Sequence, residues 1–443
     1  MASPSFFLGG RPLLRRDCLR LLAGVALIPP IHGCQRASTP ITPVPLTDDQ
    51  FLDLMQQAGC LYFAEQASPV NGQVLDRAAA FPSNGQIDPR TMASIAATGF
   101  GLSALCIADQ RGYLPHASIL SQVRNTLRYH CNTLTNVNGF FYHFNDVNTG
   151  QRISNVELSS IDTAILICGV LTVRAWFQQD AEIVQLATTI YERVNWPWML
   201  NGGQTFSMGW TPENGFIASR WEHYCELMMI YLLALGSPTY PIGPACWSAW
   251  SRPTITYDGL TYISAADPLF VHQYSHAWFD FRNKQDQFAN YFTNSVTATQ
   301  AHEAFCIAMG SPYSQSYWGI SASDSQHGYT AWGGPNAAGQ SFGGVDGSVV
   351  PNAAAGSLPF LSTDCLRTLR ALKDNFGGQA WGRYGFCDAF HPAANWYDHD
   401  VLGIDLGIGV LMAENFRTGF VWNTFARNPE VGIAMQRAGF HAV

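Results

Sequence analysis

The sequence predicts an all-α fold, in the form of an (α/α)6 toroid of paired helices. Three observations lead to this prediction. Apolar residues recur at helical spacing in about twelve segments after residue 47, whereas strand-like runs such as 140–144 are few and short. No alternation of strands and helices of the kind that builds a parallel sheet is visible. Helices joined by long Gly-, Asn- and aromatic-rich loops fit a ring of paired helices better than a four-helix bundle.

Helical periodicity gives the expected elements in chain order. Helices are expected over 47–66, 91–110, 116–134, 159–178, 181–194, 219–236, 284–308, 357–376, 404–416 and 428–438, with shorter ones near 244–250 and 268–274. The Gly/Ala/Ser-rich stretch 333–357 is interpreted as a long binding loop, because helices resume after it and it contains an Asp and an aromatic residue. One domain over 47–443 is therefore expected.

Composition favours a globular protein that does not bind polyanions. Hydrophobic residues make up 47% of the 443 residues and charged residues 13%, so a sizeable core can form. The net charge is -8, and Lys284 and Lys373 are the two lysines in the sequence. Nucleic acid is therefore not expected as a partner. Aromatic residues beside Gly, Asp or Asn in loops suit a sugar ligand, although core packing explains any single Trp equally well.

The N-terminus has the features of a targeting segment. Arg15 and Arg16 precede the apolar run 19–31, which is too short to span a bilayer, and Cys34 follows the small Gly33. The stretch RRDCLRLLAGVALIPPIHGC resembles a bacterial twin-arginine signal that ends in a lipoprotein cleavage box. The resemblance implies a signal over 1–34, lipidation of Cys34 and export to the periplasm or outer membrane, with plain cleavage or a retained anchor as alternatives. Residues 35–46 are expected to form a linker.

The cysteines do not follow a metal-binding pattern. The sequence has 11 of them, an odd number, without CxxC or Cys/His ligand spacing. Several lie within apolar helical segments, where a small buried thiol is the commoner role. We therefore expect neither a metal site nor an obligatory disulfide framework, and no cofactor.

The stretch SRWEHYCELMMIYLLALG at 219–236 places two glutamates one helical turn apart at the start of an apolar segment. Ser219 and Glu222 have the spacing of a capping box, which would give Glu222 a structural role. Glu226 has no such explanation and is expected one turn deeper, in a buried helix. Burial would raise its pKa, as a general acid requires, although a hydrogen bond to a neighbouring helix or Arg would also explain it.

Further carboxylates stand at the expected starts of other apolar helices. Asp162 in ELSSIDTA and Asp405 in VLGIDLG each fall in a first helical turn, where the helix dipole favours a negative charge. Glu157 precedes Asp162 in a loop, and Asp388 lies between aromatic residues in YGFCDAF. If these helix N-termini face one opening, the carboxylates converge there, and two of them could carry out glycosidic chemistry.

Several motifs together resemble the bacterial glycoamylase-like domain family. They are SRWEHYCELMMIYLLALGSPTYPI, DPLFVHQYSHAWFDFRNKQD, YWGISASDSQHGY, GSVVPNAAAGSLPF, WGRYGFCDAF, VLGIDLG with ENFRTGFVW, and upstream VLDRA, SIAATGFGLSALCIA, GFFYHF and ELSSIDTA. The resemblance extends from about residue 50 to the C-terminus, and the combination of motifs is highly specific. The family includes endo-β-1,2-glucanases and is related to the transglycosylase module of cyclic β-1,2-glucan synthases.

The resemblance implies an (α/α)6 barrel that hydrolyses β-1,2-linked glucose polymers by inversion and without metal. Glu226 matches the family glutamate of WxxYxE and becomes the candidate general acid, and Asp405 in GID becomes the candidate base. Glu157 and Asp162 match acidic positions in the mouth of the active site. Inversion predicts that the two catalytic carboxyl groups lie about 6.5–9.5 Å apart, or farther if a relay carries the proton.

Further residues are assigned to substrate binding. Four tryptophans are expected to stack on sugars, and four charged residues are expected to hold sugar hydroxyls. They are Trp210, Trp278, Trp318 and Trp396, and Asp76, Arg77, Asp280 and Arg282. Glu157, Asp162 and Asp388 are assigned to substrate binding as well. Core packing or a structural ion pair is the alternative explanation for each.

Other function classes remain open. A transglycosylase or glucosyltransferase would use the same pocket while excluding water, and the family name also covers glucoamylases that cleave α-glucans. A non-catalytic glycan-binding surface lipoprotein is a third class, which the pair Glu226 and Asp405 disfavours because a binding protein does not need two buried carboxyls. The expected partners are a glucan or gluco-oligosaccharide and, through a lipid on Cys34, a membrane. The chain is expected to be a monomer.

Overall fold

The computed structural model describes residues 45–265, 268–335 and 345–443. The chain divides into two units, Met1–Pro45 and Leu46–Val443, and every element described here belongs to the second. The predicted signal over 1–34 with Cys34, and nearly all of the predicted linker, lie outside the described residues. Within the described ranges, no helix is both long enough and apolar enough to cross a bilayer.

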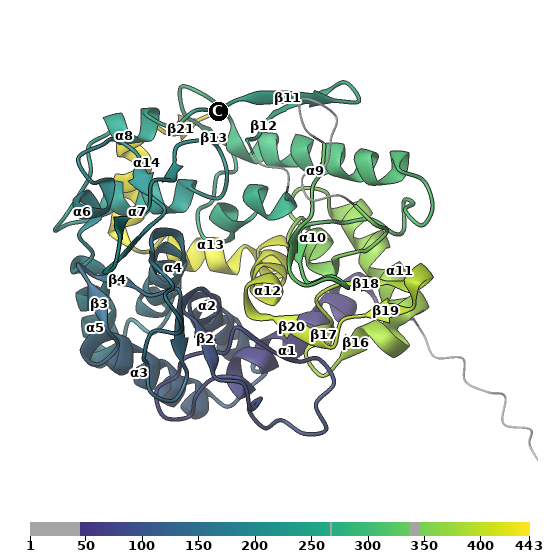
Figure 1. Ribbon diagram of the computed structural model, residues 1–443, viewed down its shortest axis with the longest axis horizontal. Helices are drawn as coiled ribbons and strands as arrows, with labels where there is room; N and C mark the ends of the chain where they lie inside the picture. Colours follow the sequence, from purple (N-terminus) through teal and green to yellow (C-terminus); the bar gives the residue numbers. More distant parts are fainter. Residues whose placement is uncertain (1–44, 266–267, 336–344) are drawn as a thin grey trace, which may run out of the picture. The chain divides into compact units, whose positions relative to one another are not determined.

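Helices dominate the second unit (Figure 1). The α-helices are α1 (Asp48–Glu65), α2 (Ile95–Arg111), α3 (His116–Asn132), α4 (Ser160–Trp176), α5 (Ala181–Glu192), α6 (Trp196–Leu200), α7 (Met228–Gly236), α8 (Ala245–Ser248), α9 (Tyr291–Ala308), α10 (Pro351–Ala355), α11 (Ser362–Ala380), α12 (Gly403–Thr418), α13 (Phe420–Phe425) and α14 (Pro429–Arg437). The 3₁₀ helices are η1 (Leu269–His272), η2 (Tyr274–Ala277) and η3 (Pro392–Ala394).

Short strands lie in the connections between the helices and are more numerous than the sequence predicts. They are β1 (Arg77–Ala79), β2 (Met92–Ser94), β3 (Asn136–Val137), β4 (Phe140–Phe141), β5 (Phe144–Asp146), β6 (Leu158–Ser159), β7 (Phe206–Ser207), β8 (Gly209–Thr211), β9 (Gly215–Phe216), β10 (Arg220–Trp221), β11 (Thr254–Tyr257), β12 (Leu260–Ile263), β13 (Lys284–Gln285), β14 (Ala322–Ser323), β15 (Thr330–Ala331), β16 (Trp381–Gly382), β17 (Gly385–Phe386), β18 (Phe390–His391), β19 (Trp396–Tyr397), β20 (Asp400–Leu402) and β21 (His441–Ala442). The pairs are antiparallel, for example β1 with β20, β2 with β5, and β6 with β8. The strands therefore fasten loops to one another and do not form a continuous sheet.

The helices fall into an inner and an outer group. Nearly every residue of α2, α4, α7 and α12 is buried, as their almost uniformly apolar or small-residue sequences require. In contrast, α3, α5, α11 and α14 bury only one face. Figure 1 shows α2 and α12 near the middle of the unit, with α3, α5 and α11 at its periphery. The sequence pattern thus separates core helices from covering helices.

The inner helices α2 and α4 pack with their backbones almost in contact. A Cβ atom added to Gly169 would lie 2.1 Å from the carbonyl oxygen of Gly99, and one added to Gly99 would lie 2.4 Å from that of Ile165. Only glycine permits this approach. The close packing fixes the start of α4 relative to the start of α2, where functional carboxylates stand.

Backbone hydrogen bonds connect the first residues of three inner helices. The N–H of Gly403 in α12 donates to the carbonyl of Asp76 (2.8 Å), and the N–H of Asp76 donates to Met92, just before α2 (2.9 Å). The N–H of Ile95 donates to His143 (3.4 Å), whose own N–H donates to Glu157, just before α4 (3.0 Å). The N-terminal ends of α2, α4 and α12 are therefore held side by side.

Several predicted helices begin later than expected because strands precede them. Residues 92–94 form β2, so α2 begins at Ile95 and not at residue 91. Residues 284–285 form β13, so α9 begins only at Tyr291, where Asn290 caps it. The expected segment 268–274 forms the 3₁₀ helix η1. Periodicity missed α6, α10 and α13, which have five or six residues each and are too short to show a repeat.

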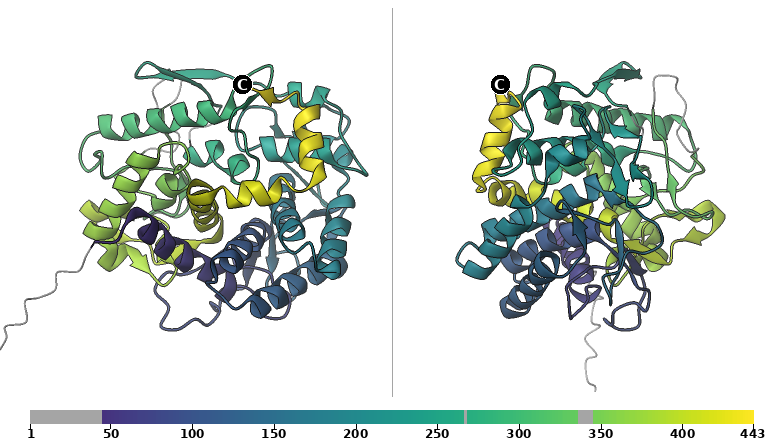
Figure 2. Two further views of the ribbon diagram at one scale, coloured as in Figure 1. Left: turned by 180° about the vertical axis from the view of Figure 1, so that it is seen from behind. Right: turned by 60° about the vertical axis from the view of Figure 1, so that its left-hand side comes forward.

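The C-terminal helices α13 and α14 lie on the opposite side of the unit from the view in Figure 1. Figure 2 (left) shows them in yellow at the front when the unit is seen from behind. Arg174 of α4 ties this region to the core through Asn428 (2.9 Å) and Glu430 (2.6 Å). The nine cysteines within the described residues are free, and most are buried.

Candidate active site

Glu226 lies in a turn immediately before α7. The prediction of a helix over 219–236 with a capping box at its start is wrong, because α7 begins at Met228. Residues 220–221 form β10, which pairs with β7 and so uses the backbone groups that a helix would need. The hydroxyl of Ser275 instead accepts from the N–H of Met229 (3.0 Å) and donates to the carbonyl of Glu226 (2.7 Å). Ser275 therefore fixes the turn that presents Glu226.

Glu222 is an exposed loop residue without a capping role. Its N–H donates to the carbonyl of Arg220 (3.0 Å), and its carbonyl accepts from Ser251 (2.8 Å). The side chain is 49% exposed, and its nearest charged neighbour is His223 at 3.9 Å. The two glutamates differ in their surroundings, since of the two only Glu226 lines the cavity described below. The capping role predicted for Glu222 is wrong.

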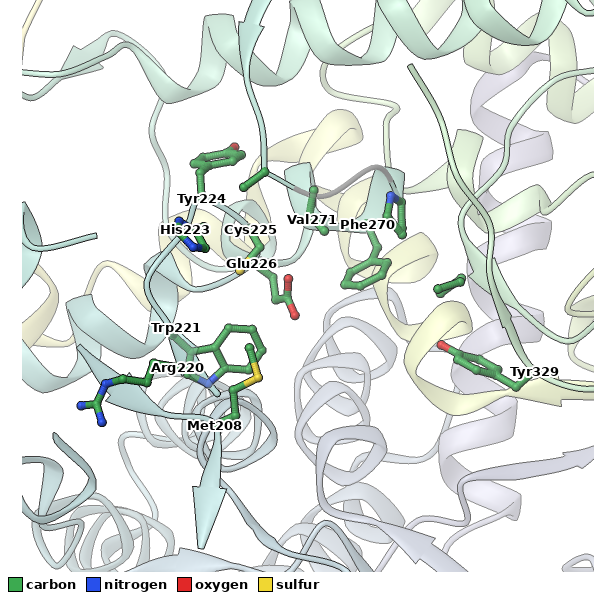
Figure 3. Close-up of a pocket in the computed structure, with 14 residues that line it drawn as sticks. Met208, Arg220, Trp221, His223, Tyr224, Cys225, Glu226, Phe270, Val271 and Tyr329 are labelled. Atoms are coloured by element: carbon green, nitrogen blue, oxygen red, sulfur yellow. The ribbon is translucent and has the colours of Figure 1, made fainter. Parts of the chain in front are cut away.

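Glu226 projects into a largely apolar cavity of about 450 Å³. The lining residues are Met208, Arg220, Trp221, His223, Tyr224, Cys225, Glu226, Ala265, Pro268, Phe270, Val271, Ala322, Tyr329 and Ala331. Figure 3 shows the carboxyl group of Glu226 and the hydroxyl of Tyr329 pointing into the space between them. The cavity therefore joins the turn before α7 to the hairpin β14–β15.

The surroundings of Glu226 favour its protonated form near neutral pH. Burial raises the pKa of this carboxyl from 4.5 to about 7, and the nearby negative charge of Asp162 raises it further. Hydrogen bonding from the backbone and from Cys225 opposes the rise without cancelling it. A carboxylic acid with a pKa near 7 can donate a proton at neutral pH.

Asp405 stands in the first turn of α12, as predicted, and is buried together with Asp388. Burial raises the pKa of Asp405 to about 7, and a hydrogen bond from Asp388 limits the rise. Burial and the Asp405 charge raise the pKa of Asp388 well above its ordinary value. Asp388 therefore keeps a proton and donates it in a hydrogen bond, so Asp405 is the member that ionises. Burial therefore opposes the ionisation of Asp405 that its place in the first turn of α12 favours.

Asp76, Arg77 and Asp324 form an ion-paired group beside this pair. Nε of Arg77 is 3.2 Å from Oδ2 of Asp76, and Nη1 is 2.6 Å from Oδ2 of Asp324. The backbone N–H of Asp324 donates to Oδ2 of Asp388 (2.8 Å). The pairing of β1 with β20 places Arg77 opposite Leu402, close to the start of α12. Arg77 therefore carries the positive charge that partly offsets a cluster of aspartates.

His143 joins the two acidic residues at the start of α4. Its Nδ1 is 3.2 Å from Glu157 and its Nε2 is 3.5 Å from Asp162. Burial alone would lower the pKa of His143, but Asp162 and Glu157 raise it to about 9, so the ring is positively charged at neutral pH. Asp162 also accepts a hydrogen bond from Ser159 (2.5 Å). The sequence predicts Glu157 and Asp162 in one place, and the structure brings them together.

Two tyrosines connect the cavity of Glu226 to the aspartate cluster. Tyr274 in η2 interacts electrostatically with Asp405, Glu226 and Asp162, and with Tyr329. Tyr329 lines the cavity and also interacts with Asp405. The two predicted catalytic carboxyls therefore share Tyr274 as an electrostatic neighbour, although Asp405 does not line the cavity of Glu226.

The four tryptophans assigned to sugar stacking divide into two groups. Trp278 is 1% exposed and donates to Ser103, and Trp318 is 0% exposed. Both belong to the core, and stacking on a sugar is excluded because no face is free. Trp210 on β8 and Trp396 on β19 are partly exposed and stay candidates.

Asp280 and Arg282 belong to a different surface. They form an ion pair (2.9 Å), and Arg282 lies over the ring of Trp422. They line a separate pocket together with Lys284 and residues of the C-terminal segment, including Phe440. Their assignment to the site of Glu226 is therefore wrong, since this pocket shares none of the residues that line the first.

The acidic site does not have the donor arrangement of a metal centre. Among the described residues, no group of three or more His, Cys, Asp or Glu side chains is placed to hold a metal ion. Hydrogen bonds and ion pairs to Arg77, His143 and backbone N–H groups occupy several of the carboxylate oxygens instead.

Comparison with protein families gives the same picture as the geometry. Residues 218–429, from the strand before Glu226 to beyond α12, match the Glycoamylase family model, described as "Putative glucoamylase". This part of the chain, slightly less than half of it, is similar to the glycoamylase-like family. The resemblance expected from the sequence is therefore confirmed.

The chain is also similar to proteins of known name. An exo beta-1,2-glucooligosaccharide sophorohydrolase (non-reducing end) of Parabacteroides distasonis is 26% identical over 448 residues, which cover 89% of this chain and 58% of that protein. The chain thus spans less than two thirds of this curated relative. The endo-beta-1,2-glucanase of Chitinophaga pinensis, solved with sophorotriose and glucose, is 25% identical, covers 90% of this chain and 99% of its own, and has a TM-score of 0.80. A beta-1,2-glucanase of P. distasonis is 26% identical over 90% of this chain and 61% of its own, with a TM-score of 0.81.

Sequence reasoning missed four polar residues of the candidate site. Asp324 and Tyr329 stand in the quoted motif YWGISASDSQHGY, Tyr274 in HQYSHAW and His143 in GFFYHF, yet none received a role. Tyr274 lies in the 3₁₀ helix η2, and the other three lie in connections next to short strands, where no periodicity indicates the direction of a side chain. Their presence in the motifs was the available signal.

Proposed function

We propose that the chain is a glycoside hydrolase that cleaves β-1,2-linked glucans by inversion, within an (α/α)6 toroid of paired helices. The observation that carries the proposal is Glu226, which lines an apolar cavity and has its pKa raised to about 7 by burial. The named relatives support a β-1,2-glucan as substrate. The inner helices α2, α4, α7 and α12, covered by outer helices, support the toroid.

The chemistry follows from the two protonation states. Protonated Glu226 donates its proton to the glycosidic oxygen as the bond to the anomeric carbon breaks. A water molecule attacks that carbon from the opposite face, and ionised Asp405 receives the proton that the water loses. Asp388 keeps its own proton and stabilises the Asp405 charge by its hydrogen bond. The product has the inverted, α configuration at the new reducing end.

Endo action is the first candidate, and exo action is the second. The C. pinensis relative, which this chain matches over 99% of its length, is an endo enzyme. The curated P. distasonis relative releases sophorose units from the non-reducing end, as its name states. Further alternatives are transglycosylation, α-glucan hydrolysis and pure glycan binding. Analysis of the reaction products distinguishes each of them from β-1,2-glucan hydrolysis.

Product analysis tests the proposal. Purified protein is incubated separately with linear β-1,2-glucan and with starch, and the products are separated by chromatography over time. A ladder of short β-1,2-oligosaccharides indicates endo hydrolysis, and sophorose alone indicates exo action. Products longer than the substrate indicate transglycosylation. Hydrolysis of starch alone, or of neither polymer, contradicts the proposal.

We further propose that the protein is exported and attached to a membrane by a lipid on Cys34. The twin-arginine-like stretch before Cys34 supports this proposal. Cys34→Ser is expected to release the full chain from the membrane fraction of a bacterial host without lowering hydrolysis. Unchanged membrane association of the variant would contradict lipidation at this position.

A further inference from the structure

Tyr274 has a rigid ring and an unused hydroxyl beside the two carboxyls. The side chain is 5% exposed, and its ring packs edge-on against Phe100 (5.4 Å between centroids) and at a tilt against Phe270 (5.0 Å). Within the described residues, no hydrogen bond involves its hydroxyl oxygen, which is not sealed off from solvent either. A buried Tyr usually pairs its O–H, so an unpaired one beside a cavity indicates a ligand group.

The electrostatic neighbours of Tyr274 include both proposed catalytic carboxyls. Asp405, Glu226 and Asp162 all act to raise the pKa of Tyr274, after burial itself, and Tyr329 does the same. A phenol that keeps its proton among carboxylates is a hydrogen-bond donor at every pH at which the protein would work. Phe270, which holds the Tyr274 ring, is itself a lining residue of the cavity. The next residue, Ser275, donates to the carbonyl of Glu226, so Tyr274 lies between two residues that shape this end of the cavity.

Tyr329 faces the same space from the opposite wall. Its side chain is 53% exposed, and its hydroxyl end points into the cavity (Figure 3). The loop that carries it is anchored at Asp324, which pairs with Arg77 (2.6 Å) and donates its N–H to Asp388 (2.8 Å). Ser325 closes the loop by donating to the carbonyl of Gly328 (2.7 Å). The aspartate cluster therefore also positions an aromatic face.

We propose that Tyr274 and Tyr329 together form the subsite for the glucosyl unit at the cleaved bond, with the Tyr274 hydroxyl donating to a sugar hydroxyl and the Tyr329 ring covering the sugar. This inference rests on the proposed function and adds two substrate-contacting residues to it. The two residues contribute to different steps. The Tyr274 group is fixed before substrate arrives and so acts mainly on the transition state, whereas Tyr329 mainly binds the substrate.

Three variants and one control test the pair with β-1,2-gluco-oligosaccharides. Tyr274→Phe keeps the ring and removes only the hydroxyl, so kcat should fall about 10- to 100-fold with little change in KM. Tyr329→Ala should raise KM about tenfold or more, and Tyr329→Phe should lie between Tyr329→Ala and the wild type. The control is Tyr191→Phe, because Tyr191 is equally buried and donates to the carbonyl of Leu233 (2.8 Å), which lies outside the lining of the cavity.

The control separates a subsite from a merely structural role. Tyr191→Phe should lower the thermal midpoint and leave kcat and KM unchanged. Tyr274→Phe should lower kcat and leave the thermal midpoint unchanged. The inference is overturned if Tyr274→Phe has wild-type kcat/KM, or if both Tyr→Phe variants lose activity only in proportion to stability.

Calorimetric titration with a sophoro-oligosaccharide distinguishes failure of this inference from failure of the proposed function. A wild type that binds the oligosaccharide without hydrolysing it contradicts the proposed function. In that case, weaker binding by Tyr329→Ala still supports the subsite, and unchanged binding by Tyr329→Ala overturns it. A wild type that does not bind contradicts both.

Discussion

At the scale of single residues, the protonation of Glu226 depends on where its carboxyl lies. The side chain leaves a turn held by Ser275 and enters an apolar cavity, and burial raises its pKa to about 7. Glu222, four residues earlier, is largely exposed in a loop. Two chemically identical side chains in one segment therefore differ in function because their environments differ.

Replacement of each glutamate by glutamine tests this difference. Glu226→Gln removes the donated proton and is expected to lower kcat by about 10²- to 10⁴-fold or more. Glu222→Gln, its matched control, should stay within about twofold of the wild type in activity and within about 0.5 kcal/mol in stability, as for other exposed sites. Steady-state kinetics on β-1,2-glucan and thermal unfolding provide both readouts. Similar losses of activity in the two variants would contradict the assigned roles.

The pH dependence of stability tests the same carboxyl without an assay of activity. The pKa of Glu226 is raised from 4.5 to about 7 in the folded protein, so its contribution to stability is complete below pH 4.5 and is lost as pH rises through 7. Glu226→Gln cannot ionise. The variant should match the wild type at pH 5 and exceed it by about 1–3 kcal/mol at pH 8. Equal stability of the two proteins at pH 8 would show that burial of the ionised Glu226 carboxylate does not destabilise the folded protein.

At the scale of elements, the inner helices set the position of the catalytic groups. Gly99 and Gly169 allow α2 and α4 to pack backbone to backbone, and the connections before α2, α4 and α12 are joined by hydrogen bonds. Asp162 and Asp405 are thereby brought to one end of the helices. Close helix packing and the shape of the site are consequently coupled.

Alanine substitutions at two helical glycines test this coupling. Gly169→Ala would place a methyl group 2.1 Å from the Gly99 carbonyl oxygen, so the helices must separate, at an expected cost of about 1–3 kcal/mol or more. Gly378 in α11 has open space around it, and Gly378→Ala should be neutral or stabilise the protein by about 0.5–1 kcal/mol. Chemical denaturation measures both. A neutral Gly169→Ala would contradict the close approach of α2 and α4.

The sequence predicted the long helices and the acidic residues better than the connections. Periodicity located α1, α3, α4 and α5 to within about two residues at each end. It misplaced the start of α7, because strand pairing by Arg220 and Trp221 competes with helix formation and is not visible in an apolar pattern. Trp278 and Trp318 were wrongly assigned to sugar stacking for a related reason. A sequence motif shows which residue is present but not whether its side chain is buried in the core.

At the scale of the whole described unit, one side carries the acidic site and another carries the C-terminal helices. The cavity of Glu226 and the aspartate cluster involve the segments that precede α4, α7 and α12. The pocket of Asp280 and Arg282 belongs instead with the C-terminal segment. The proposed hydrolysis involves only the first of these sites, which holds the buried carboxyls Glu226 and Asp405.

The stereochemistry of the first product tests the central claim most directly. Linear β-1,2-glucan is mixed with the wild-type protein inside an NMR spectrometer, and the anomeric proton signals are followed before mutarotation proceeds. Inversion by Glu226 and Asp405 predicts that the α anomer of the new reducing end appears first and then equilibrates with the β anomer. Initial appearance of the β anomer, or no reducing ends at all, would contradict the account.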